Sequence, residues 1–230
     1  MTSLETGLQE AALQEATGAA GVPVLATKRL TLRAGRARDA KAIASLINDR
    51  RIAENTARIP HPYALADAHA FLAQVNRNPG EPSFSVVLAD GTIIGGCGIH
   101  MLSSGEPELG YWIGVPYWGR GYATEAARAV LDHGFGALGY AQLTSRARVS
   151  NPASRRVLEK CGFQWNGVAL IRIHALKSSA PVDCFRLDRG LWASLRSWGN
   201  ANRVARGRKT REAGAREQGS CGQSSCESGP

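Results

Sequence analysis

The sequence lacks the features that would assign it to a membrane, secreted or disulfide-rich class. No apolar run approaches the roughly 20 residues that a membrane-spanning helix needs. Residues 1–20 contain no lysine or arginine ahead of an apolar stretch, so they do not resemble a secretory signal. The five cysteines are odd in number and widely spaced, which argues against a disulfide framework. We therefore expect a cytoplasmic protein with no membrane partner.

Metal-binding patterns are missing as well. The five histidines show no metal-ligand spacing, and Cys221 and Cys226 have no histidine or further cysteine nearby to complete a zinc site. No Ser-His-Asp pattern has a supporting context, which argues against a hydrolase. We expect no metal cofactor.

What is present is typical of one globular domain with extensions. Hydrophobic residues make up 43% of the 230 residues, enough for one sizeable core. We expect a flexible leader over residues 1–24, a folded domain over 25–198 and a basic disordered tail over 199–230, because the tail has almost no apolar residues.

The net charge of +9 is concentrated in the predicted domain. Residues 1–20 carry −3 and residues 196–230 carry +4, which leaves +8 for the residues between them. A basic globule attracts anions such as nucleic acid, an acidic membrane surface or a polyphosphate cofactor. Charge alone does not choose among them.

The hydrophobic periodicity predicts an α+β fold, with one mixed sheet and helices on its faces. Helices are expected at 39–47, 68–75, 122–138 and 152–161. Strands are expected at 30–32, 84–88, 92–99, 108–114, 142–149, 163–173 and 182–187. On the second helix we expect Ala68, Phe71, Leu72 and Val75 to share a buried face.

The most informative segment is a glycine-rich turn between a strand and a helix, Gly119-Arg120-Gly121. Glycines allow successive backbone N–H groups to converge, and a helix N-terminus adds unpaired donors and partial positive charge. Together they suit a phosphate group. The spacing fits neither a Walker loop nor a dinucleotide fingerprint, so the alternative is a tight connection without a ligand.

A second motif joins the turn and carries a family resemblance. Asn151-x-x-Ser154 opens a short helix with Asn151 as N-cap, and Lys160-x-Gly162-Phe163 closes it. Together with the strand Glu108–Trp112 and the turn Gly119–Ala123, these motifs resemble the GCN5-related N-acetyltransferases. They are most similar to the branch that acetylates N-termini of ribosomal proteins, which Thr27–Arg33 and Pro60–Tyr63 also fit. The resemblance spans residues 25–190.

This resemblance implies a GNAT fold with about seven mostly antiparallel strands, splayed between the fourth and fifth, and acyl transfer from acetyl-CoA to an amine. The pantetheine arm would lie in the splay, and the turn would hold the pyrophosphate. The implied cofactor contacts are Ile113, Val115, Trp118, Gly119, Arg120, Gly121, Tyr122, Ala123, Thr124 and Asn151. Asn151 has a second interpretation as a helix cap alone. Trp118 departs from the Gln or Arg of many family members.

The resemblance also implies two catalytic residues. Glu108, at the start of the splayed strand, is the candidate general base, and its alternative is a solvated carboxylate. Ser154 is the candidate acid for the departing thiolate, and its alternative is a local backbone hydrogen bond. Leu158 stands where other branches carry a tyrosine acid, which argues against that mechanism. Asn166 stands where this branch often has Glu, a change that could alter the acceptor pocket.

Three functions follow from these observations. The first is acetylation of a protein α-amine by direct attack in a ternary complex. The second is acetylation of a small amine such as an antibiotic or polyamine, which the basic core disfavours for polycations. The third is a non-catalytic ribosome- or RNA-binding module, motivated by the basic residues of the tail, whose alternative is a solubilising terminus. These residues are Arg203, Arg206, Arg208, Lys209 and Arg211.

Overall fold

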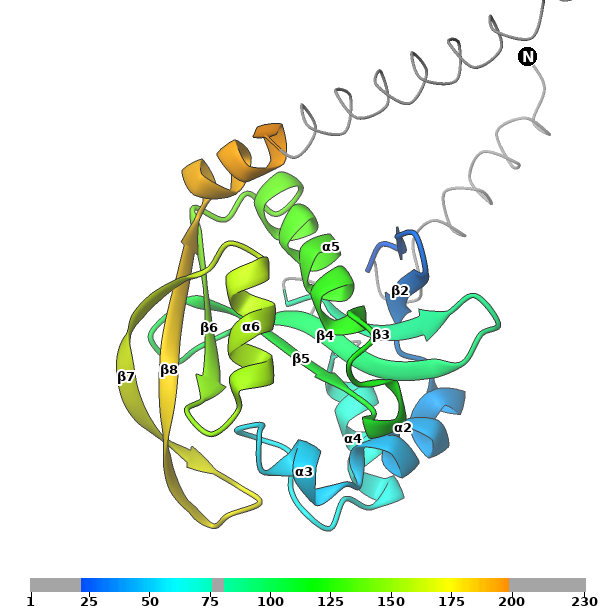
Figure 1. The fold of residues 1–230 in the computed structure, drawn as a ribbon. Coiled ribbons are helices and arrows are strands. Elements are labelled where there is room, and N and C mark those ends of the chain that lie inside the picture. Colours follow the sequence, from blue (N-terminus) through cyan, green and yellow to red (C-terminus); the bar gives the residue numbers. More distant parts are fainter. Residues whose placement is uncertain (1–21, 76–80, 199–230) are drawn as a thin grey trace, which may run out of the picture. The chain divides into compact units, whose positions relative to one another are not determined.

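The computed structural model describes residues 22–75 and 81–198 (Figure 1). The chain divides into two compact units, one ending at Arg189 and the other beginning at Gly190. This division lies ahead of the predicted domain end at residue 198. Residues 190–198, the described part of the second unit, are helical. The predicted tail, with its basic residues, and residues 1–21 of the predicted leader lie outside the described residues.

One eight-stranded sheet organises the first unit, in the order β1-β2-β3-β4-β5-β6-β8-β7. Its strands are β1 Leu25–Ala26, β2 Leu30–Ala34, β3 Ser83–Leu88, β4 Ile93–Met101, β5 Pro107–Ile113, β6 Gln142–Arg148, β7 Gln164–Ile173 and β8 Ser178–Asp188. Every pairing is antiparallel except that of β5 with β6. The predicted mixed sheet is confirmed. It has one strand more than expected because β1, only two residues long, shows no readable periodicity.

Helices cover both faces of the sheet, with α5 and α6 in front of it and α2 and α4 behind (Figure 1). The helices are α2 Ala40–Ile47, α3 Arg50–Ala53, α4 Leu65–Val75, α5 Tyr122–Gly136 and α6 Pro152–Lys160, with 3-10 turns η1 Ala37–Asp39 and η2 Val115–Tyr117. Helix α3 was not predicted because four residues are too few to show a 3.6-residue period. The prediction that Phe71 belongs to the buried face of α4 is wrong, because Phe71 is 38% exposed. Ala68 and Leu72 are buried, as predicted.

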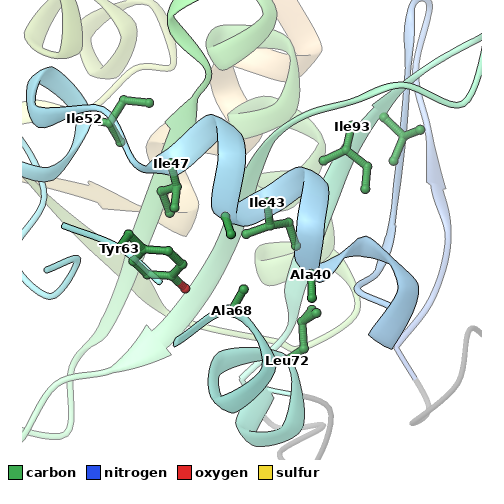
Figure 2. Close-up of a cluster of buried hydrophobic side chains, with 10 residues drawn as sticks. Ala40, Ile43, Ile47, Ile52, Tyr63, Ala68, Leu72 and Ile93 are labelled. Carbon is green, nitrogen blue, oxygen red and sulfur yellow. The ribbon is translucent and has the colours of Figure 1, made fainter. Parts of the chain in front are cut away.

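A hydrophobic cluster between α2 and α4 supports the sheet beneath the site (Figure 2). Ala40 of α2 lies near Leu72 of α4 there, and Ile47 of α2 lies near Tyr63. Trp112 of β5 and Val115 of η2 pack against the same cluster. The core therefore fixes the position of the strand and turn that the sequence motifs occupy.

Strands β5 and β6 diverge after a single paired position. Glu108 lies opposite Thr144, and no further bridge joins these two described strands. The Thr144 hydroxyl donates to the Pro107 carbonyl at 3.1 Å, and the Ser145 hydroxyl donates to the Leu109 carbonyl at 2.9 Å. Side chains thus replace the backbone ladder where the strands separate. The predicted splay is present, between the fifth and sixth strands because β1 shifts the count. Among the described residues, no helix is long and apolar enough to cross a bilayer.

Candidate active site

The splay leaves backbone groups of β5 directed toward the gap. Gly114 N–H donates to the Ile94 carbonyl at 2.8 Å, while Ile113 stands opposite Gly95. In an antiparallel ladder this pattern makes Ile113 and Gly95 a non-hydrogen-bonded pair. The N–H and C=O of Ile113 therefore point away from β4, toward β6. The N–H of Val115 opens η2, where helical geometry offers it no partner within the turn.

The glycine-rich turn follows η2 and ends at the N-terminus of α5. Gly119 and Gly121 have φ of 75° and 77°, in the left-handed region, where a Cβ is unfavourable by roughly 1–2 kcal/mol. No side chain caps α5, and Gly121 is its N-cap. The first N–H groups of a 15-residue helix are thus available beside the splay, and Arg120 is exposed between the glycines. Such a turn fits a pyrophosphate.

Arg29, which lies between β1 and β2, binds this turn directly, a role that its local sequence does not indicate. Its guanidinium donates to the Arg120 carbonyl at 3.0 Å and pairs with Glu125 of α5 at 2.6 Å. It also lies 4.6 Å from the centre of the Tyr122 ring, a cation–π distance. The Thr27 hydroxyl donates to the same Glu125 carboxylate at 2.7 Å. The turn therefore has a fixed shape before any ligand binds.

Asn151 and Ser154 lie together at the start of α6. The Asn151 side chain accepts a hydrogen bond from Ser154 N–H at 3.1 Å, which is the predicted N-cap. The Ser154 hydroxyl lies 2.8 Å from the hydroxyl of Tyr111 on β5. Burial raises the pKa of Tyr111 well above its ordinary range, against the opposite effect of the Ser154 hydrogen bond. Tyr111 is therefore a protonated donor at neutral pH, and it bridges the splay.

Glu108 is buried and engaged by two bases. Arg146 of β6 binds its two oxygens at 2.5 and 2.7 Å, and His100 Nε2 lies 2.9 Å from Oε2. Burial raises the pKa of Glu108, but the hydrogen bonds and charges of Arg146 and His100 outweigh it and lower the pKa to about 2. Glu108 is thus an anion of weak basicity. The alternative of a solvated carboxylate does not hold, because Glu108 is 6% exposed.

Trp118 departs from the expected turn chemistry. Its indole N–H donates to the Ile113 carbonyl at 2.6 Å, and the ring is 46% exposed. The indole therefore binds the Ile113 carbonyl, the acceptor that faces the gap. The Ile113 N–H is left to donate to a ligand. Arg51 of α3 lies over the Trp118 ring at 5.9 Å.

No cysteine near the splay is an activated nucleophile. Burial raises the pKa of Cys97 beyond its ordinary range and that of Cys161 to about 11. Both thiols stay protonated at neutral pH. In the described part of the chain, no cluster of three or more His, Cys, Asp or Glu side chains could hold a metal ion.

The predicted residues therefore gather around one splay. The structure brings the backbone of Ile113 and Val115, the turn Trp118–Thr124, and Asn151 with Ser154 to its margins, and places Glu108 at its closed end. The roles of Tyr111, Arg29 and Arg146 were not predicted. The aromatic residues that surround Tyr111 in the sequence, Trp112, Tyr117 and Trp118, were the available signal for the first, whereas nothing in the sequence pairs Arg29 or Arg146 with its distant carboxylate.

A strand splay beside a glycine turn at a helix N-terminus defines a class of acyl-CoA-binding fold, and the family follows from sequence. Residues 29–164, more than half of the chain, match the model of the acetyltransferase (GNAT) domain. The chain belongs to this family. It is an acetyl-CoA-dependent N-acetyltransferase, an acyltransferase that uses acetyl-CoA as co-substrate.

Relatives and solved structures agree with this assignment. The chain is 31% identical over 169 residues to the uncharacterized N-acetyltransferase YoaA of Bacillus subtilis (strain 168), covering 70% of this chain and 93% of that protein. It is 34% identical over 85 residues to the putative ribosomal N-acetyltransferase YdaF of the same organism. That match covers 36% of this chain and 46% of YdaF. It shares its fold with the microcin C7 self-immunity acetyltransferase MccE, whose structure is in complex with acetyl-CoA and AMP. The TM-score is 0.61 and the sequence identity 20%, and the match covers 70% of this chain and 93% of that chain.

Proposed function

We propose that the protein acetylates the α-amine of a protein N-terminus. The observation that carries this proposal is that Glu108, the buried carboxylate beside the splay, is bound by Arg146 through both oxygens at 2.5 and 2.7 Å, which lowers its pKa to about 2 and makes it a weak base. An α-amine has a pKa of about 7.7–8.0 and a lysine amine about 10.4. A site with so weak a base suits the amine that is already partly neutral at pH 7. The printed name of YdaF, a putative ribosomal N-acetyltransferase, supports the same acceptor class.

The cofactor-binding residues take these roles in the proposal. The N–H groups of Ile113 and Val115 hold the pantetheine side of acetyl-CoA and polarise its thioester carbonyl. The turn Gly119–Thr124 holds the pyrophosphate, with Trp118 at its entrance, and Asn151 bonds the pantetheine amide while it caps α6. Acetyl-CoA bound there supplies the activated acetyl group.

We propose direct attack of the amine on the thioester, because both buried thiols beside the splay are protonated. The neutral amine attacks the carbonyl carbon, so the C–N bond forms and the C–S bond breaks. Glu108 accepts a hydrogen bond from the amine or its water, and because its low pKa makes it a poor store for the proton, the proton of the attacking nitrogen passes through that water to solvent. Ser154 donates its proton to the departing thiolate and regains one from solvent. Tyr111 is a positioning residue, since its hydroxyl orients that of Ser154 at 2.8 Å.

The Ser154–Tyr111 pair predicts coupled effects on turnover. Ser154→Ala should lower kcat about 10-fold to 100-fold, because a hydrogen bond to a charged group is worth about 1.5–3 kcal/mol. Tyr111→Phe should lower kcat less, and should add nothing in the Ser154→Ala background. Steady-state kinetics measure this, with Tyr117→Phe as the matched control. Additive losses, or a change in the KM for acetyl-CoA with kcat intact, would show that the pair serves only packing.

Acetyl transfer to defined amines tests the proposed function. Peptides with a free N-terminus, the same peptides with a blocked N-terminus and one internal lysine, and a polyamine are incubated with acetyl-CoA and followed by thiol release and mass spectrometry. We expect one acetyl group on the free N-termini. Transfer confined to the polyamine or the lysine would contradict the α-amine assignment, and no transfer despite acetyl-CoA binding would contradict amine acetylation as a whole.

A further inference from the structure

We propose that the acceptor of this site is a peptide whose terminal amine is followed by acidic side chains, held in a basic cavity between the 60–61 loop and the turn after β7. The proposal rests on the proposed function and specifies its substrate. Three of the cavity's residues, Arg172, His174 and Lys177, lie outside the family motifs.

The cavity has a volume of about 270 Å³ and an uncompensated basic lining. It is lined by Pro60, His61, Arg172, His174 and Lys177. Two of these side chains are permanent cations, the two imidazoles can donate hydrogen bonds, and no carboxylate lines it among the described residues. A concave site of this composition fits a carboxylate rather than an ammonium group.

A continuous set of contacts connects the cavity with the splay. Arg148 ends β6, the strand that carries Arg146, and donates to the Glu54 carbonyl at the end of α3 at 3.0 Å. Three residues further on, the Ala57 carbonyl accepts from His174 N–H at 3.0 Å. Helix α3 lies across the open end of the splay, close to the tip of the β7–β8 hairpin (Figure 1). An acceptor can therefore extend from the splay to the cavity.

The acidic side chains around the cavity are already neutralised. Asp49 pairs with Arg51 at 2.7 Å, and Glu54 pairs with Arg50 at 2.5 Å. The charge of His61 in the lining also lowers the pKa of Asp49. No salt bridge among the described residues engages Arg172 or Lys177, so these two cations are available to a negatively charged peptide.

Lys177 of the lining stands at a turn position that favours glycine. It is the one non-glycine residue with positive φ, 54°, in the described part of the chain. A turn at that φ favours glycine or asparagine. Replacing Lys177 by glycine therefore removes a cation from the cavity without straining the turn.

Three peptides that differ only after the first residue test the proposal. They begin Ser-Glu-Glu, Ser-Gln-Gln and Ser-Lys-Lys, and kcat/KM is measured for each at low and high salt. We expect the acidic peptide to react roughly tenfold faster than the neutral one, with an advantage that salt removes, because exposed charges are screened. Equal or faster reaction of the neutral or lysine peptide overturns this inference and leaves the proposed function intact. No reaction with any peptide overturns the proposed function, and this inference with it.

Two variants locate the effect in the cavity. Lys177→Gly relieves the strained turn, so the melting temperature should stay or rise, while the KM for the acidic peptide rises about twofold to fivefold. Arg172→Gln should add to this loss, whereas Arg186→Gln on β8, outside the cavity, is the matched control. The neutral peptide should be unaffected by any of them. An unchanged KM for the acidic peptide in the double variant would contradict the site.

Discussion

Replacing Gly121 by glutamate is expected to abolish the thermal stabilisation that acetyl-CoA gives to this protein. At 100 times its dissociation constant, a ligand adds about 2.7 kcal/mol to the free energy of unfolding. For a domain of this size that is a rise in melting temperature of roughly 5–11 °C. We expect that rise in the unmodified protein and none in the variant.

The reason lies in the geometry of the turn. Gly121 has φ of 77° and is the N-cap of α5, and a Cβ there would lie 3.6 Å from the guanidinium of Arg29. A glutamate would strain the backbone and place a carboxylate at the helix N-terminus where we propose that the pyrophosphate binds. Binding of the cofactor is then opposed by both shape and charge.

Gly91→Glu is the matched control for this substitution. Gly91 has φ of 87°, and nothing lies within 4 Å of a Cβ built there. The two variants share the strained backbone and the added charge, so only the position differs. Differential scanning fluorimetry with and without acetyl-CoA should show a shift for Gly91→Glu alone. A full shift in Gly121→Glu would mean that the pyrophosphate does not lie on this turn.

Arg146→Met is expected to destabilise the fold by about 3–5 kcal/mol at neutral pH, because it leaves the buried Glu108 charge without its bidentate partner. This corresponds to a fall in melting temperature of roughly 6–20 °C. Glu108→Gln combined with Arg146→Met removes both charges and should recover most of the loss. If the double variant is as unstable as the single one, packing by the Arg146 stem is the cause.

The same pair predicts how the loss depends on pH. The pKa of Glu108 is about 2 in the folded protein, against an ordinary value of 4.5. A lowered folded pKa adds stability that is fully present above about pH 4.5 and disappears as the pH falls toward 2. The difference between the unmodified protein and Arg146→Met should therefore be largest at neutral pH and shrink below pH 4.5. Chemical denaturation across this range measures it, and a constant difference would contradict the charge argument.

The features that depend on neighbouring residues could be predicted from the amino-acid sequence. The Gly119-Arg120-Gly121 turn, the Asn151 cap and the α5 and α6 helices were predictable, because each is a backbone conformation or a hydrogen bond within a few residues. The mixed sheet followed from the order of these elements, and the resemblance of the motifs pointed to the splay.

The chemistry of the site depends on contacts between residues that lie far apart in the sequence. Glu108 is a weak base because Arg146, which is 38 residues away in the sequence, binds it. Ser154 forms its hydrogen bond with Tyr111, which is 43 residues away in the sequence. The turn keeps its shape through Arg29, 96 residues from Glu125. Such pairs are set by strand order and burial rather than by local periodicity. Burial and distant charge are what shift a pKa or orient a hydroxyl, so the roles of these side chains could not be predicted from the sequence.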